Sequence, residues 1–246
     1  MTAVLYAIPG SHPCAAVEKA LQIKGIGYRR DERIPVAHRL PTRLRFGTGS
    51  VPALTFADGS RVSGSRAIVR ALEERVAQPA LLPAGRDLRA RVERAEEWGD
   101  QVLQPLARRL IWAALRRAPA AIDTYTGGAK LALPRPLARA GGPLLARLAQ
   151  RLVGAGDPSV RADLLSLPGH LDRIDRWIAD GTIGAESANA ADLQIGASLR
   201  LLLTIEDLAP LVDARPACAL ARRWFPDYPG AVPAGTLPGG WIPRAG

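Results

Sequence analysis

The first 78 residues alternate short apolar runs with amphipathic stretches, a pattern that predicts strands and helices in turn. An uncharged apolar run over residues 4–8 is typical of a buried strand. Pro9-Gly10 interrupts it, and residues 11–23 then place apolar side chains on one face of a helix. Gly25 is expected to end that helix. The chain is therefore predicted to begin with a strand, a tight turn and a helix.

The rest of this region predicts three more strands and two more helices. Residues 27–34 carry many charges, which is typical of an edge strand. Residues 51–56 are apolar, and the proline near their start is tolerated there in a strand. Asp58-Gly59 is a strong signal for a hairpin turn. The other expected elements are a short helix over 36–46 interrupted at Pro41, a strand at 61–62, and a helix over 66–75 with Ser65 as its cap.

A Pro-rich linker at residues 79–86 separates this region from a helical one. Residues 87–246 are expected to form an all-helical domain that ends in an extended tail rich in Pro and Gly. Residues 193–205 are apolar on nearly every side, which predicts a buried central helix, and Asn189 with Asp192 forms a capping-box variant before it. The remaining expected helices cover residues 87–117, with a kink at Pro105, residues 159–180, with a break at Pro168, and residues 215–224. The tail that follows is expected to be held by Tyr228 and Trp241.

A basic amphipathic stretch over residues 143–153 has two interpretations. It could lie on a membrane surface, but amphipathic helices more often cover a core, and the pattern favours that role. No apolar stretch of the sequence is long enough to span a bilayer, and the first residues do not resemble a signal peptide. The sequence therefore predicts a cytoplasmic protein without stable membrane insertion.

The 246 residues carry a formal net charge of +10, and only three of the 33 Lys and Arg residues are lysine. Such a charge could attract nucleic acid or an anionic membrane. The arginines are spread along the chain without interleaved aromatic residues, which favours a solvated surface and no nucleic-acid partner. Cys14 and Cys218 are too distant in sequence to indicate a disulfide framework or a metal site, and the three histidines lack ligand spacing.

The turn at residues 11–14 carries the most distinctive chemistry. Ser11 stands where a helix N-cap is expected, and Pro13 lies just inside the helix, where its missing N–H costs nothing. Cys14 lies three residues after Ser11 and so on the same side of the first turn. A helix N-terminus stabilises anions, so Ser11 could hold a thiolate or Cys14 could become one. The alternative is a plain serine cap followed by a small buried cysteine.

Several stretches together resemble the glutathione S-transferase family, which implies an α/β thioredoxin-like N-terminal domain over 1–78 followed by an all-α C-terminal domain. The Ser-His-Pro-Cys turn is similar to a glutaredoxin-like Cys-Pro-x-Cys site with serine in place of the first cysteine. The other stretches that carry the resemblance are Ala20 to Tyr28, Gly49 to Leu54, Ser65 to Ile68, and Asn189 to Asp192.

The resemblance implies specific roles for residues of this domain. Ser11 would hold the thiolate of glutathione, which then attacks an electrophile. Pro52 would follow a cis peptide bond, and the Val51 backbone would pair with the cysteinyl backbone of glutathione. Ser65, at a helix N-terminus, would bind the γ-glutamyl carboxylate. Gly64, Arg66 and His12 are further candidates for substrate binding.

Other residues depart from the family pattern. Gly64 stands where the family usually has Glu or Gln, so one ligand contact is missing. Cys14 occupies the resolving position of a dithiol site whose partner is Ser11, so dithiol exchange is not expected. Tyr6 lies too early for the turn and is interpreted as packing. His12 is interpreted as an exposed turn residue, with a pH-dependent helper as the alternative. Arg39, Arg43 and Arg45 are candidates for the glycine carboxylate of glutathione.

Two classes of function follow. The first is a transferase that conjugates a small thiol, with glutathione as co-substrate and no metal, to an electrophile located near Trp112 and Tyr125. The second is a thiol- or ligand-binding regulatory protein without turnover. Variants of the first use another small thiol, or use Cys14 as a glutaredoxin-like reductase. A detoxification role and a homodimer are expected by analogy with the family.

Overall fold

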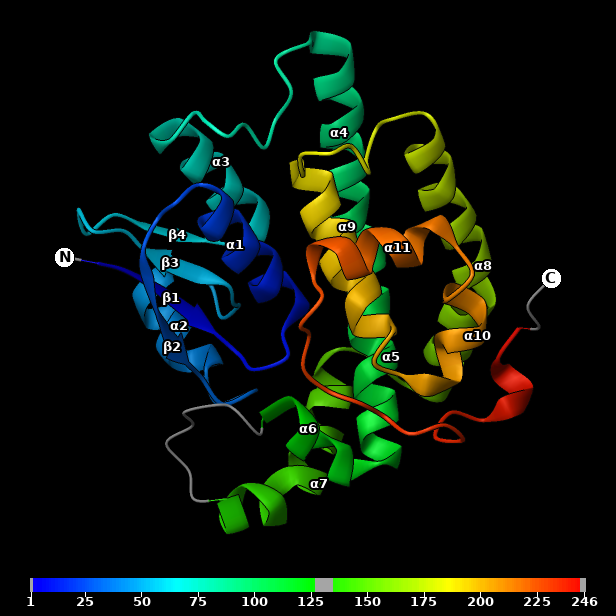
Figure 1. Ribbon diagram of the computed structural model, residues 1–246. Coiled ribbons are helices and arrows are strands. Elements are labelled where there is room, and N and C mark those ends of the chain that lie inside the picture. Colours follow the sequence, from blue (N-terminus) through cyan, green and yellow to red (C-terminus); the bar gives the residue numbers. More distant parts are fainter. Residues whose placement is uncertain (1, 127–134, 244–246) are drawn as a thin grey trace.

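The computed structural model describes residues 2–126 and 135–243. A four-stranded sheet at one side of the molecule is joined to a larger group of helices at the other (Figure 1). The strands are β1 (Ala3–Ala7), β2 (Tyr28–Glu32), β3 (Ala53–Thr55) and β4 (Arg61–Ser63), in the order β2-β1-β3-β4. β1 pairs parallel to β2 and antiparallel to β3, and β3 pairs antiparallel to β4. The predicted charged edge strand is confirmed.

Three helices complete the N-terminal domain: α1 (His12–Ile23), α2 (Arg39–Phe46) and α3 (Ser65–Arg75). The expected interruption of α2 at Pro41 is wrong, because Pro41 lies in the first turn, where no helical N–H is required. The expected cap Ser65 is also wrong by one residue. Gly64 caps α3 with φ 94°, a conformation that glycine adopts without a steric penalty, and Ser65 is the first helical residue.

The predicted helix over 87–117 is divided into two. α4 (Arg86–Trp98) continues through a π-helical segment, Gly99–Leu103, into α5 (Gln104–Arg117). Within the π-helical segment, Gly99 lies against Ile195 of a neighbouring helix. Pro105 has no N–H to donate to the Gln101 carbonyl four residues earlier, so the π-helical segment lies where the proline interrupts the α-helical hydrogen bonds.

The helix α9 (Ala190–Leu202) occupies the centre of the helical domain, as predicted. Twelve of its residues are buried, and only Arg200 is not. Its capping box is complete, since the Asn189 side chain accepts from the backbone of Asp192 while the Asp192 carboxylate accepts from the Asn189 N–H. α1 of the first domain packs directly on α9 (Figure 1).

Further helices surround this centre. α8 (Asp157–Ala179) runs without the break expected at Pro168, because Leu164, Leu167 and Leu171 keep its buried face packed on either side of the proline. α7 (Arg135–Leu152) packs on α5, although Leu144 is 70% exposed. The remaining helices are α6 (Ile122–Thr126), α10 (Ala209–Val212) and α11 (Pro216–Trp224).

Two sets of contacts connect the N-terminal domain to the linker and to the helical domain. Lys24 at the end of α1 is buried, and its Nζ donates to the carbonyl oxygens of Val76 and Pro79 at 2.7 and 2.6 Å. Arg70 of α3 pairs with the buried carboxylate of Glu96 on α4. The Pro-rich segment between α3 and α4 is therefore held at both ends.

The C-terminal tail runs from α11 across the helical domain (Figure 1). As expected, Tyr228 and Trp241 contribute to holding it: the Tyr228 hydroxyl donates to the Gly10 carbonyl at 2.7 Å, and the Arg117 guanidinium lies 5.2 Å from the centre of the Trp241 ring. Val232 adds a short bridge to Ile205. The tail thereby contacts the turn that carries Ser11. Across residues 2–126 and 135–243, no helix combines the length and apolar character needed to cross a membrane.

Candidate active site

A cavity of about 420 Å³ lies between the two domains. Its walls come from the turn after β1, from residues 34–39 and 49–51, and from α5, α6 and α7. Trp112 and Tyr125, which the sequence placed near an electrophile, both line it. Apolar side chains dominate the lining, including Ile34, Val36, Ile111, Leu115, Ile122 and Leu145. The size and lining are those of a site for a small organic molecule.

Ser11 stands at the N-cap of α1 and lines this cavity. Its backbone is extended, with φ −79° and ψ 114°, and its carbonyl accepts from the Ala15 N–H at 3.0 Å. Within α1 the Ser11 side chain makes no capping hydrogen bond. The hydroxyl instead contacts the Cys14 thiol, and it lies where the positive end of the α1 dipole favours an anion.

Cys14 is not placed for catalysis. Only 1% of its surface is exposed, and burial raises the pKa of its thiol to about 11, although the adjacent Ser11 hydroxyl acts in the opposite direction. A thiol in this state is protonated near neutral pH and is a poor nucleophile. The burial of Cys14 favours the alternative of a small buried cysteine over a catalytic thiol.

The Val51–Pro52 peptide bond is cis, as the family resemblance implied. Val51 lines the cavity, and Pro52 is buried behind it. The Pro52 carbonyl accepts from the Gly64 N–H at 2.9 Å, which connects this turn to the start of α3. Ser11 and Val51 therefore face one cavity from two different loops.

Gly64, Ser65 and Arg66 are not among the described residues that line the cavity. Gly64 and Ser65 lie at the N-terminus of α3, a position suited to an anion. A Cβ placed on Gly64 would meet no atom within 4 Å, so the space beside it is open. Arg66 instead pairs with Glu96 of α4 at 3.6 Å. In this contact the Arg66 guanidinium joins the two domains.

His12 is buried rather than exposed, which corrects the sequence interpretation. It is 3% exposed, and its Nδ1 lies 3.1 Å from the Ser198 hydroxyl of α9. Burial lowers the pKa of His12 well below 6.5, and the nearby Arg108 guanidinium lowers it further. The ring is therefore neutral at physiological pH. His12 packs between the domains because α1 lies on α9, a contact that no local pattern encodes.

Two tyrosines have their hydroxyls engaged near the turn. The Tyr125 hydroxyl lies 2.5 Å from the Thr204 hydroxyl, and burial raises the pKa of Tyr125 to about 12. Burial also raises the pKa of Tyr228 well above 10. Tyr6, interpreted as a packing residue, indeed packs edge-on against Phe46. The hydroxyls of Tyr125 and Tyr228 are thus both held by hydrogen bonds within the protein.

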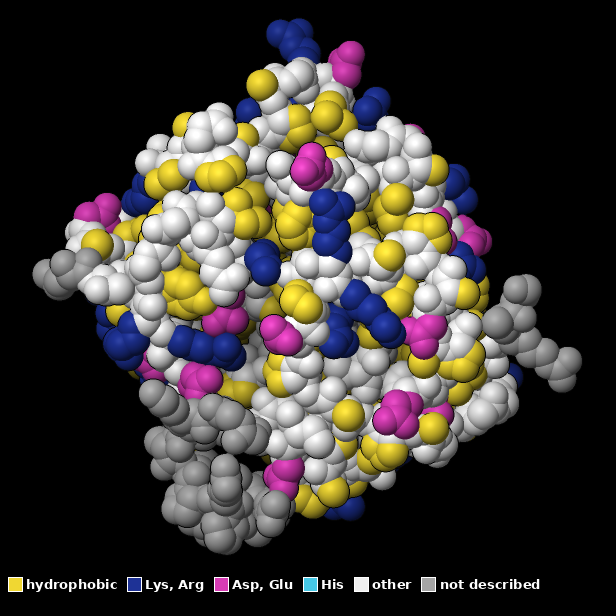
Figure 2. All heavy atoms as spheres, viewed as in Figure 1, with side chains coloured by type: hydrophobic (Ala, Val, Ile, Leu, Met, Phe, Trp, Pro, Cys, Tyr) yellow, Lys and Arg dark blue, Asp and Glu magenta, His cyan; other side chains and the backbone are white. Residues whose placement is uncertain are grey.

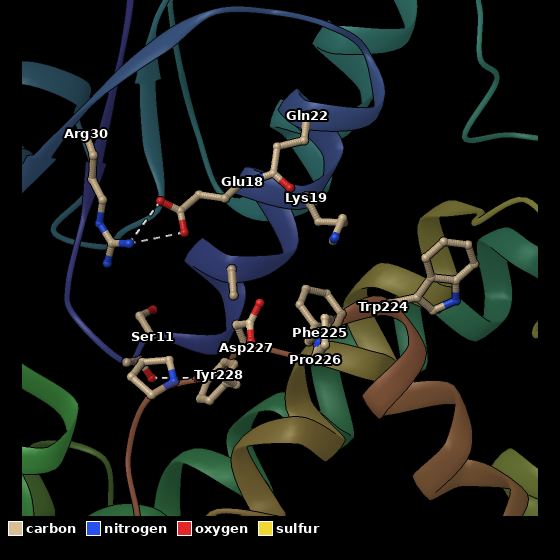
Figure 3. A pocket seen from close by; sticks show the side chains of 13 residues that line it. Ser11, Glu18, Lys19, Gln22, Arg30, Trp224, Phe225, Pro226, Asp227 and Tyr228 are labelled. Atoms are coloured by element: carbon tan, nitrogen blue, oxygen red, sulfur yellow. Dashed lines mark hydrogen bonds and ion pairs between the residues drawn. The ribbon is translucent and has the colours of Figure 1, made fainter. Parts of the chain in front are cut away.

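A smaller cavity of about 250 Å³ also reaches Ser11 (Figure 3). It lies between α1 and the tail residues 224–229. Glu18 and Arg30 form an ion pair in its wall, with a shortest separation of 3.1 Å, and Lys19 and Asp227 also line it. In contrast to the larger cavity, this one is lined by charged side chains of both signs.

Residues 5–80 match the family model for the N-terminal domain of glutathione S-transferases. These residues form a glutathione S-transferase N-terminal domain. Solved structures extend the likeness to the whole fold. A glutathione S-transferase from Rhodospirillum rubrum F11 is 22% identical, with a TM-score of 0.62 over 91% of this chain and 86% of that one.

Two further structures have the same fold. A glutathione S-transferase from Methylobacterium radiotolerans, in complex with glutathione sulfonate, is 18% identical with a TM-score of 0.63 over 100% of this chain and 97% of its own. Glutathione transferase F7 from Populus trichocarpa is 17% identical with a TM-score of 0.63, over 92% and 94%. A comparison with curated proteins found no match. The predicted thioredoxin-like domain followed by an all-helical domain is confirmed.

Within this glutathione S-transferase fold, Arg39 is the one of the three candidate arginines that lines the large cavity in the described part of the chain. Arg45 instead lies over the Tyr6 ring. Arg108 of α5 also lines the cavity and was missed, because one arginine among many in an amphipathic helix gives no local signal. The described residues contain no group of three or more His, Cys, Asp or Glu side chains arranged to hold a metal ion.

Proposed function

We propose that this protein binds glutathione and conjugates it, through its sulfur, to an electrophilic small molecule. The observation that carries the proposal is the convergence of the Ser11 hydroxyl, at the N-terminus of α1, and the Val51 backbone on one cavity. Support comes from the N-terminal domain match and from a structural neighbour solved with glutathione sulfonate.

In the proposed reaction, the Ser11 hydroxyl donates a hydrogen bond to the glutathione sulfur. This bond and the α1 dipole favour the thiolate over the thiol, and the proton passes to solvent. The thiolate then attacks the electrophilic carbon, so that a carbon–sulfur bond forms as a leaving group departs with its electron pair. Neutral His12 and protonated Cys14 take no part in this proton transfer.

The peptide part of glutathione would lie along the N-terminal domain. The Val51 N–H and C=O would pair with the cysteinyl backbone as an added strand does. The γ-glutamyl carboxylate would bind at the N-terminus of α3, where Gly64 leaves open space and Ser65 begins the helix. Arg39 would bind the glycine carboxylate, because it is on the cavity wall while Arg45 is engaged with Tyr6.

Substitution of Ser11 tests this assignment. Ser11→Ala is expected to reduce kcat/KM for conjugation by about 100-fold, since the loss of one preorganised donor to a developing anion has that order of effect. Cys14→Ala is expected to retain activity within about threefold, because the buried thiol is protonated. Ser166→Ala, at an exposed position on α8, is the control. Full activity in Ser11→Ala together with loss in Cys14→Ala would contradict the proposal and favour the reductase.

A binding protein without turnover is the second candidate, favoured by Gly64 in place of an acidic or amide side chain at the α3 terminus. Retention on immobilised glutathione combined with no conjugation of any electrophile in a panel would select it. We also propose that the protein is a homodimer, by analogy with the family. Sedimentation equilibrium of the purified chain measures its oligomeric state directly.

A further inference from the structure

One face of α5 forms a continuous wall of the large cavity. Arg108, Ile111, Trp112 and Leu115 all line it, and their spacing of three and four residues places them on the same side of the helix. Three of these four side chains are apolar. Arg108 is therefore a single cationic group at one end of an apolar strip about two helical turns long.

The charge of Arg108 lacks a carboxylate partner. Its Nη2 donates to the Gln104 amide oxygen at 2.5 Å, and Gln104 in turn donates to the Asp100 carboxylate at 2.8 Å. Asp100 acts on Arg108 only at this longer range, and Arg108 forms no direct ion pair within the described part of the chain. Arg109, the next residue, differs: it pairs with Asp163 through two contacts of 2.7 Å. Arg108 is half-buried, so its guanidinium is partly desolvated without a direct ion pair, and a bound anion on the cavity wall would supply one.

The groups facing Arg108 also point to an anion. Burial lowers the pKa of Arg108, while the Asp100 carboxylate acts in the opposite direction; Cys14 and His12 also lie within electrostatic range of it. His12 is neutral and its Nε2 has no hydrogen-bond partner among the described residues, while Cys14 is protonated. Neither His12 nor Cys14 compensates the charge, and Asp100 does so only at longer range through Gln104. Arg108 is thus placed beside the turn that carries Ser11, at the reactive end of the cavity.

We propose that the electrophile is an apolar, ring-sized molecule that carries a carboxylate, with the carboxylate bound by Arg108 and the apolar body along Ile111, Trp112 and Leu115. A guanidinium binds a carboxylate through two parallel hydrogen bonds and so fixes its orientation as well as its charge. This inference rests on the proposed transferase function, and it adds the substrate class.

A matched pair of electrophiles tests it: 4-chloro-3-nitrobenzoate and its neutral amide, 4-chloro-3-nitrobenzamide. In both, the glutathione sulfur forms a bond to the ring carbon as the carbon–chlorine bond breaks and chloride leaves. The two differ in charge and share the ring and the leaving group. Comparison of their kcat/KM values therefore isolates the contribution of the carboxylate.

Arg108→Met is expected to lower kcat/KM for the benzoate by about 30-fold or more, since truncating one partner of a desolvated charge pair has at least that effect. For the amide the change is expected to stay within about twofold. Arg108→Lys should restore part of the benzoate activity, because the charge returns without the bidentate geometry. Arg116→Met, on α5 but outside the described cavity lining, is the matched control.

The possible results separate the two proposals. Arg108→Met could lower kcat/KM equally for the benzoate and the amide and raise the pKa of the glutathione thiol in the pH profile. That result would overturn the substrate assignment and show that Arg108 instead stabilises the thiolate. Unchanged values for both would also overturn it. Absence of turnover of either compound by the wild-type protein would instead contradict the transferase proposal. In that case, calorimetric binding of 4-chloro-3-nitrobenzoate alone, lost in Arg108→Met, would still support the anion site, and no binding would overturn it.

Discussion

Ser11 borders two cavities that differ in how they treat charge. In the smaller cavity, the Glu18 carboxylate and the Arg30 guanidinium compensate each other within the wall (Figure 3). In the larger cavity, Arg108 has no carboxylate partner among the described residues, and most of the lining is apolar. A wall whose charges are paired is complete without a ligand, whereas a half-buried cation without a direct ion pair gains one from a bound anion. The proposal therefore places the electrophile in the larger cavity.

On the molecular surface, as in the smaller cavity, many charged side chains are paired with charges of the opposite sign. On the face shown in Figure 2, basic side chains are interspersed with acidic ones rather than gathered into one patch. Many arginines are paired, such as Arg215 with Asp172 at 2.6 Å and Arg222 with Asp213 at 2.7 Å. The net charge of +10 is therefore distributed over local pairs and single exposed groups.

The largest effect is expected from a change that disrupts both cavities at once. Gly230 has φ 103°, and a Cβ placed on it would lie 2.0 Å from the ring of Tyr125, which lines the larger cavity. Tyr228, which precedes Pro229 and Gly230, lines the smaller cavity. Gly230→Ala should lower the free energy of unfolding by roughly 3 kcal/mol, through overpacking and an unfavourable φ. Urea unfolding measures this.

Gly240→Ala is the matched control for that substitution, because a Cβ at Gly240 meets nothing within 4 Å. It should change the free energy of unfolding by less than about 0.5 kcal/mol. Equal stability of the two variants would contradict the close packing of the tail at Gly230 against the Tyr125 ring.

A smaller effect, visible as a pH dependence, is expected from His12. The pKa of His12 is lowered in the folded protein by burial and by Arg108, so the unfolded chain binds the proton more readily. The neutral, folded form is thus stabilised above pH 6.5, and stability is lost as the pH falls from about 6.5 towards the lowered pKa. His12→Gln should lose less stability than the wild type between pH 7.5 and pH 5.5.

Urea unfolding at those two pH values measures the His12 contribution. His38 and His170 also have lowered pKa values, mainly through burial, so the wild-type slope includes them. His170→Gln is the control that leaves the inter-domain contact with Ser198 intact. An identical pH dependence in wild type and His12→Gln would contradict the buried, neutral state of His12.

The smallest effect is expected in the smaller cavity. Glu18→Gln removes the ion pair with Arg30, which is partly exposed to solvent, and should cost about 0.5 kcal/mol of unfolding free energy. Conjugation activity should stay within about twofold of wild type. A loss of activity comparable to that of Ser11→Ala would place the substrate in the smaller cavity and reverse the comparison.

Local patterns predicted much of the fold. The apolar run at 4–8, the charged edge strand and the Asp58-Gly59 turn all appear where expected. The capping box at Asn189 is also complete. These features depend on side chains within a few residues of one another, so a single sequence contains the information. The prolines were less informative, since Pro41 and Pro168 both lie within continuous helices.

The site was predicted less completely than the fold. The position of Ser11 at a helix start follows from its neighbours, and Val51 and Pro52 were placed through the family resemblance. The burial of Cys14 and the ion pair between Arg66 and Glu96 were not foreseen. Both depend on packing between elements, which the residues adjacent in sequence do not determine.

The sequence by itself determined the order of strands and helices, the turn that carries Ser11 and the buried character of α9. Only the tertiary structure decided that His12 meets Ser198, 186 residues further along the chain, and that Arg108 faces the cavity unpaired while Arg109 finds Asp163. The physical reason is that periodicity gives the face of a helix, but its partners are supplied by elements distant in sequence. Those partners fix the charge and protonation of the site.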